Sequence, residues 1–232
     1  MVTSGDLKPG ERLPSERELA EQLQVSRNVI REASKVLEAR GLVTIQTGSG
    51  VYVADVEPHT FTRSLGLYVQ RAQTSVAHVF EVRWILEVET AGLAALNATA
   101  QDIAEMEIAI EEAALSIKDL DTFAAKDILF HQLLASASQN PLLTVLLDTL
   151  ADVLRDQSSR ASALPGAQQN ALEHHRKILR AVKSRSSMLA SQAMRNHLTD
   201  GWKWIKLATV DDDKDIGDLS LVPPIPPSDL TK

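Results

Sequence analysis

The chain has 232 residues, of which 44% are hydrophobic and 24% charged, with a net charge of −7. This composition excludes a wholly disordered chain, and the negative charge argues against a protein that coats nucleic acid without specificity. Because there is no cysteine, disulfides, thiolate zinc fingers and cysteine nucleophiles are excluded. The sequence lacks a signal peptide and an apolar run of about 18 residues, so we expect a cytoplasmic protein that does not enter a membrane.

Charge is distributed unevenly along the chain, which suggests separate segments. Residues 1–54 carry seven basic and seven acidic side chains, whereas residues 211–232 carry two basic and six acidic ones. The last segment also contains two Pro-Pro pairs, which forbid a helix. We therefore predict a head at 1–54, a linker with a first helix at 55–74, a helical domain at 75–210 and a disordered tail at 211–232.

The order of elements in the head predicts a winged helix-turn-helix. Ser15 precedes Glu18 by the spacing of a capping box, and Ser26 caps a second helix that runs to about Arg40, before Gly41. The second helix should bury its apolar stripe, namely Val29, Ile30, Ala33, Val36 and Leu37. Residues 42–46 and 51–53 are prone to form strands around a Gly-rich turn, which predicts a hairpin.

Two short helices followed by a hairpin suit the major groove of DNA. Arg27, Asn28 and Arg31 lie near the start of the second helix, where side chains can reach base edges, and arginine is the commonest partner of guanine. The alternative for the arginines alone is that they are solvated surface charges. The succession of cap, turn, second cap and hairpin favours the groove.

The head resembles the GntR family of bacterial transcription regulators. The resemblance lies in residues 7–20 (LKPGERLPSERELA), 25–27 (VSR), 31–33 (REA) and 37–42 (LEARGL). It implies that DNA is contacted from the two helices and from a wing turn that enters the minor groove. The residues implied are Arg17, Ser26, Arg27, Asn28 and Arg31 in the helices and Gly48, Ser49 and Gly50 in the turn.

The family pattern includes one further helix that this sequence does not show. Family heads usually begin with a helix before the segment that here starts at Gly5, and only Met1 to Ser4 precede it. We expect either a longer true N-terminus or a missing helix. A missing helix would leave part of the small core of the head uncovered.

The body of the chain is predicted to be an antiparallel α-helical bundle, so that the fold class is mainly α. Glycine is scarce there, Asn140-Pro141 has the pattern of a helix start, and Leu164-Pro165-Gly166 is a break. The predicted helices are 60–71, 75–97, 100–117, 121–138, 141–160, 167–184 and 187–209.

Bundles build metal sites from polar side chains on inward faces. Asp127 and His131 are four residues apart and share one apolar face of their predicted helix. His175 points inward, and His197 shares its face with mostly small residues. His174 falls about 100° from His175 and should be exposed. An aspartate within an apolar stripe is costly unless it is paired or binds a cation. One aspartate and three histidines form a ligand set for a divalent transition metal. The imidazoles favour zinc or nickel, and the carboxylate keeps manganese possible as a third candidate. For each histidine considered by itself, the alternative to a metal ligand is a buried histidine that is hydrogen-bonded within the protein.

A second resemblance, to the all-helical FCD domain of the FadR subfamily, spans most of residues 70–207. It lies in residues 82–87, 127–131, 138–143, 175–182 and 193–198. The metal-binding branch of the subfamily uses an Asp, a His four residues later and two later His, and Asp127, His131, His175 and His197 match this set. Members with this set mostly sense small organic acids. The branch that binds fatty acyl-CoA lacks the full set, so acyl-CoA is not expected.

The effector site is less well specified. Arg83 lies on an apolar face of its predicted helix and therefore needs an anionic partner. One candidate is Glu87, four residues later. The other is the carboxylate of an effector, whose remaining oxygens would complete the open coordination positions of the metal. Arg155 is a weaker candidate for effector binding.

Taken together, the patterns predict a ligand-responsive regulator that is not an enzyme. We expect a repressor that binds a palindromic double-stranded operator as a homodimer, with a small carboxylate effector that changes operator affinity. One alternative is a metalloenzyme, since an open metal position could activate water, but no further inward base stands out. The other is a regulator with a purely structural metal.

Overall fold

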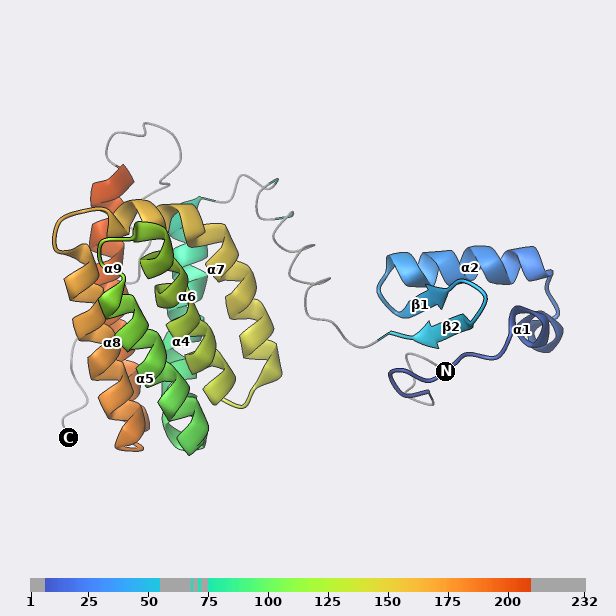
Figure 1. Ribbon diagram of the computed structural model, residues 1–232, viewed down its shortest axis with the longest axis horizontal. Helices are drawn as coiled ribbons and strands as arrows, with labels where there is room; N and C mark the ends of the chain where they lie inside the picture. Colours follow the sequence, from blue (N-terminus) through green and yellow to red (C-terminus); the bar gives the residue numbers. More distant parts are fainter. Residues whose placement is uncertain (1–6, 55–67, 69–70, 72–74, 210–232) are drawn as a thin grey trace. The chain divides into compact units, whose positions relative to one another are not determined.

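The computed structural model describes residues 7–54, 68, 71 and 75–209. The chain divides into two compact units, residues 1–64 and 65–232, which are shown in Figure 1 and described separately below. The predicted tail and most of the predicted 60–71 helix lie outside the described residues. The mainly α fold class is confirmed.

The first unit contains α1 (Glu16–Leu23), α2 (Arg27–Ala39), β1 (Val43–Gln46) and β2 (Gly50–Val53). Ser15 and Glu18 form the predicted capping box, in which the Ser15 N–H donates to the Glu18 carboxylate at 2.8 Å. Ser26 accepts from the backbone N–H of Val29, so it caps α2 as predicted. Gly41 follows α2 with φ +71°, the left-handed conformation that glycine adopts at lowest cost.

The two strands form an antiparallel hairpin. Its register runs from Val43 opposite Val53 to Gln46 opposite Gly50. The segment before α1 extends the hairpin, because the N–H of Leu13 donates to the carbonyl of Val51 at 2.8 Å. The head thus has the two helices and the wing that the sequence predicts.

The prediction of which α2 residues are buried is wrong in part. Val29 and Val36 are 53% and 52% exposed and Ala33 is exposed as well, whereas Ile30 and Ser34 are the buried residues of the helix. The buried face is therefore turned by about 100° from the Val29–Val36 face, one residue step along a helix. No described element of the head covers that apolar face.

The second unit is a bundle of helices, in the described part α4 (Val76–Asn97), α5 (Ala100–Leu115), α6 (Leu120–Ala137), α7 (Pro141–Ser162), α8 (Ala167–Lys183) and α9 (Ser187–Thr209). Their starts follow the local sequence, since Ser75, Thr99 and Asn140 each accept a backbone N–H as N-cap residues. Gly166 leads into α8 with φ +91°. Among the described residues, no helix is both long and apolar enough to span a bilayer.

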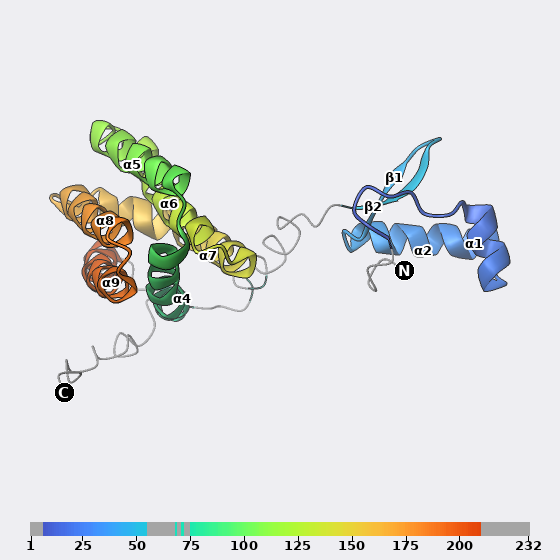
Figure 2. The ribbon, with the colours of Figure 1, turned by 90° about the horizontal axis from the view of Figure 1, so that it is seen from below.

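Helix α4 contacts α6, α7, α8 and α9, and Figure 2 shows it beside α9, which lies next to α8. Close approach of α4 and α9 depends on Gly92, because a Cβ there would lie 2.7 Å from the Oγ of Ser191. Ser191 in turn donates to the carbonyl of Val88 at 3.0 Å. This packing places the polar residues of α4 next to those of α6 and α9.

Candidate metal centre

The residues predicted to bind metal come together from three helices. Asp127 and His131 lie on α6, His175 on α8 and His197 on α9. The three histidines are 7%, 1% and 8% exposed, and each offers a ligand nitrogen within 4.8 Å of the others. The Nε2 atoms of His131 and His197 are 3.2 Å apart, and an oxygen of Asp127 lies 3.5 Å from Nε2 of His175.

These distances fit a shared metal ion. Two imidazole nitrogens bound to one tetrahedral zinc are about 3.3 Å apart, given Zn–N bonds of about 2.05 Å. Nε2 of His175 is buried and has no hydrogen-bond partner in the described part of the chain. A buried polar atom without a partner is costly, and a metal would remove that cost. The donor set therefore fits a divalent transition metal.

Burial also keeps these side chains ready to bind. It lowers the pKa of His175 and His197 well below the ordinary value, and the nearby positive charge of Arg83 acts in the same direction. Both imidazoles are therefore neutral at pH 7, with lone pairs free for a metal. Burial raises the pKa of Asp127, although His131 and Arg83 act in the opposite direction.

The lowered pKa values predict that the metal-free protein loses stability in acid. Between pH 6.5, the ordinary His value, and the folded-state pKa, the unfolded chain binds protons that the folded chain does not. The free energy of unfolding should therefore fall as pH is lowered below 6.5, by up to about 1.4 kcal/mol per pH unit for each of the two histidines. Urea unfolding of chelated protein at pH 7.5, 6.5 and 5.5 measures this, and an unchanged free energy would contradict it.

Glu87 joins the metal residues to Arg83. One of its carboxylate oxygens accepts from Nε of Arg83, four residues earlier on α4. The other lies 2.7 Å from Nδ1 of His131. Burial pushes the pKa of Glu87 upward, but Arg83 and His131 outweigh burial and hold it well below its ordinary range. Glu87, one of the two partners considered for Arg83, therefore forms an ion pair with it.

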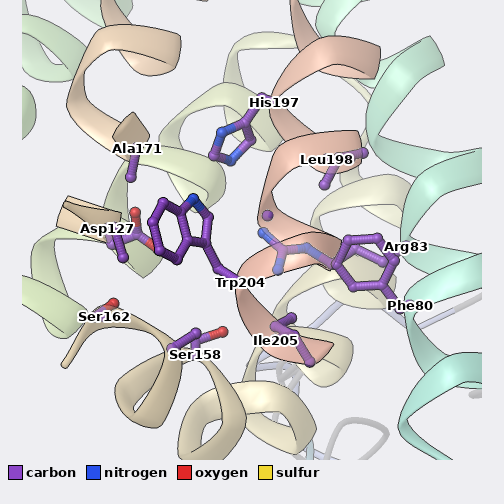
Figure 3. Close-up of a pocket in the computed structure, with 13 residues that line it drawn as sticks. Phe80, Arg83, Asp127, Ser158, Ser162, Ala171, His197, Leu198, Trp204 and Ile205 are labelled. Carbon is purple, nitrogen blue, oxygen red and sulfur yellow. The ribbon is translucent and has the colours of Figure 1, made fainter. Parts of the chain in front are cut away.

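A small cavity of about 70 Å³ adjoins this cluster. Figure 3 shows the guanidinium of Arg83 pointing into it from α4, with Asp127 from α6 and His197 and Trp204 from α9 around it. Ser158 and Ser162 of α7 add hydroxyl groups to the wall, and the rest of the lining is largely apolar: Phe80, Ala161, Ala167, Ala171, Leu198 and Ile205. Few polar groups on apolar walls are typical of a small-ligand site.

Two residues lie in surroundings that differ from those predicted for them. Arg155 is exposed on α7 and does not line this cavity, so it is not brought to the site. His174 was expected to be exposed, but it is 6% exposed, and its Nε2 lies 3.0 Å from a carboxylate oxygen of Asp200 on α9. That expectation is wrong because α9 packs along the side of α8 that carries His174.

The residues predicted to contact DNA lie on the first unit. Arg17, Arg27 and Asn28 are exposed. Arg31 is also exposed but donates through two nitrogens to the carboxylate of Glu16 on α1, at 2.7 and 3.1 Å. In the wing, Gly48 is exposed with φ +77°, Ser49 hydrogen-bonds Tyr52, and Gly50 has φ +129°.

Sequence reasoning missed three contributions to these sites. The contact of Glu87 with His131 depends on how α4 and α6 align, which no local pattern reveals. Trp204 and Ser158 line the cavity, and neither residue type signals a ligand by itself. Arg12 lies at the wing, where a Cβ on Gly50 would meet its guanidinium at 2.8 Å.

Comparisons with known proteins agree with both units. Residues 1–53 match the model of the bacterial regulatory proteins of the gntR family, and residues 78–200 match the FCD domain. The chain belongs to the GntR family. Within the family it has the FadR-like arrangement of a GntR head and an FCD domain, as the sequence predicted.

Individual relatives support the same assignment. The chain is 33% identical over 205 residues to the HTH-type transcriptional regulator LutR of Bacillus subtilis, covering 86% of this chain and 94% of LutR. It is 33% identical over 221 residues to the Uxu operon transcriptional regulator of Escherichia coli, covering 91% and 85%. A solved structure, Streptococcus agalactiae GntR, is similar with a TM-score of 0.64 and 27% identity, covering 85% and 91%. The chain is thus a ligand-responsive transcription regulator and not an enzyme.

Proposed function

We propose that the FCD domain binds one divalent metal ion through Asp127, His131, His175 and His197. Zinc is the first candidate, with nickel and manganese as alternatives. The observation that carries this proposal is the 3.2 Å separation of two buried Nε2 atoms beside a third imidazole that lacks a hydrogen-bond partner. When bound, the metal would supply open coordination positions for a ligand oxygen.

The effector, in this proposal, is a small organic acid that binds in the cavity beside the metal. Arg83 points into that cavity and uses Nε for Glu87, so the other guanidinium nitrogens are available to a carboxylate. The cavity holds about 70 Å³, well below the about 300–1,000 Å³ of drug-sized ligand sites. Its size and its single inward arginine support a short acid over a long acyl chain.

The output is a change in operator affinity. Arg17, Ser26, Arg27, Asn28 and Arg31 would bind the major groove, and the wing turn Gly48, Ser49 and Gly50 the minor groove. A homodimer presents two such heads to the half-sites of a palindrome. Acid binding at the FCD domain would favour one arrangement of the heads, and we expect the protein to act as a repressor.

A thermal-shift panel of small carboxylates and sugar acids tests the effector site. It is run on metal-loaded and chelated protein side by side. An acid at a hundredfold its dissociation constant adds about 2.7 kcal/mol, which should raise the melting temperature of a chain of this size by about 5–10 °C. We expect this shift with metal and none after chelation.

Two other outcomes would contradict this picture. An equal shift with and without metal would separate the acid site from the metal. The absence of any shift, together with a large loss of melting temperature on chelation, would favour the alternative in which the metal is purely structural.

A further inference from the structure

Glu87 occupies the position between the arginine of the cavity and the metal ligands. It is 4% exposed and lies in the middle of α4. Its two carboxylate oxygens face different partners, one the Nε of Arg83 and the other the Nδ1 of His131 at 2.7 Å. In the described part of the chain, neither that second oxygen nor Nδ1 of His131 has a hydrogen bond of regular geometry, so each has the 2.7 Å approach of the other as its polar contact.

We propose that Glu87 is a positioning residue for the metal centre, which fixes the ring of His131 so that Nε2 is the atom presented to the metal. This inference rests on the proposed function. A neutral histidine carries one N–H, and an anion at Nδ1 draws the proton there, which leaves the Nε2 lone pair free. That Nε2 is the atom that lies 3.2 Å from Nε2 of His197.

A carboxylate is needed at this position because both partners are donors. The Arg83 guanidinium and the His131 Nδ1–H each require an acceptor, and a carboxylate offers two oxygens. An amide offers only one oxygen, so its NH₂ group would face a donor on one side. Glutamine has nearly the same size and would therefore weaken one contact without emptying the site.

The arrangement also places two functions on one side chain. Arg83 lines the cavity and pairs with one carboxylate oxygen of Glu87, and His131 belongs to the metal cluster and faces the other oxygen. An acid that binds Arg83 would therefore act on a carboxylate that also holds a metal ligand. The alternative is that Arg83 and Glu87 form an ion pair that only stabilises their helix and has no role at the metal centre.

Zinc affinity of the full-length Glu87→Gln protein distinguishes the two roles. Zinc is titrated in competition with a chromophoric chelator, and urea unfolding checks that the variant is folded. We expect the zinc dissociation constant to rise about 10–100-fold, the usual effect of losing a partner behind a metal ligand. Glu89→Gln is the matched control, because Glu89 lies on the same helix but is exposed, and its zinc affinity should equal that of the wild type.

A folded Glu87→Gln protein with wild-type zinc affinity would overturn the positioning role while leaving the metal site intact. A wild-type chain that binds no zinc, nickel or manganese would overturn the proposed function as well. If Glu87→Gln does not fold, nitrogen NMR of the histidine rings in the zinc-loaded wild type decides. We expect the proton of His131 on Nδ1, and a proton on Nε2 instead would overturn the proposal.

Discussion

We expect the Arg31→Ala protein to bind its operator between about 30-fold and about 20,000-fold more weakly than the wild type. A base contact by arginine is worth about 1–3 kcal/mol, and a dimer would lose two. Zinc affinity should not change, because the replaced residue lies in the head unit. Fluorescence anisotropy with a duplex selected in vitro from a random pool, at fixed salt, measures the loss.

The ion pair of Arg31 with Glu16 requires two comparison variants, since Arg31→Ala also removes a link between α1 and α2. Glu16→Gln removes the ion pair but keeps Arg31, so its operator affinity should be at least that of the wild type. Lys35→Ala removes an exposed charge farther along α2 and should have little effect. If Glu16→Gln loses as much affinity as Arg31→Ala, Arg31 acts by holding the two helices together.

Replacement of His175 with alanine should lower metal affinity by at least about 100-fold. Loss of a partner behind a metal ligand already costs about 10–100-fold, and a direct ligand should cost more. His175 is 1% exposed and stacks on Phe130 with ring centroids 4.1 Å apart, so some loss of stability is also expected. Circular dichroism checks the helical fold, and competition titration with zinc measures the affinity.

The neighbouring residue provides the control for this experiment. His174 is also buried, but its Nε2 faces Asp200 and not the metal cluster. His174→Ala removes a side chain of the same size and should retain zinc affinity close to the wild-type value. Equal loss of zinc affinity in the two variants would mean that the change reflects unfolding of the bundle and not the loss of a ligand.

Much of the fold could be predicted because local signals mark where the elements begin. The caps Ser15, Ser26 and Asn140 start helices where the sequence places them. Burial was harder to predict where neighbours decide it. Val29 and Val36 have the spacing of a buried face, yet they are exposed because α1 and β1 pack against the adjacent face of α2.

The candidate site could also be predicted where signals within one helix suffice, and it could not be predicted where contacts between helices decide. Helical spacing placed Asp127 and His131 on one apolar face and turned His175 and His197 inward, and the family resemblance then matched the four as one set. A helical wheel describes only one helix, so it could not show that α9 covers His174. Nor could it show that Glu87 of α4 lies beside His131 of α6, because that contact depends on the alignment of two helices.

In the mechanism that we propose, a metal-dependent acid site controls the DNA-binding head. This mechanism is tested most directly by the operator dissociation constant of the full-length protein, with and without the acid that gives the largest thermal shift, in metal-loaded and chelated samples. We predict that the acid changes this constant by about 5–150-fold, the usual range of coupling between two sites, in metal-loaded protein alone. The same change after chelation, or no change with metal bound, would contradict the account.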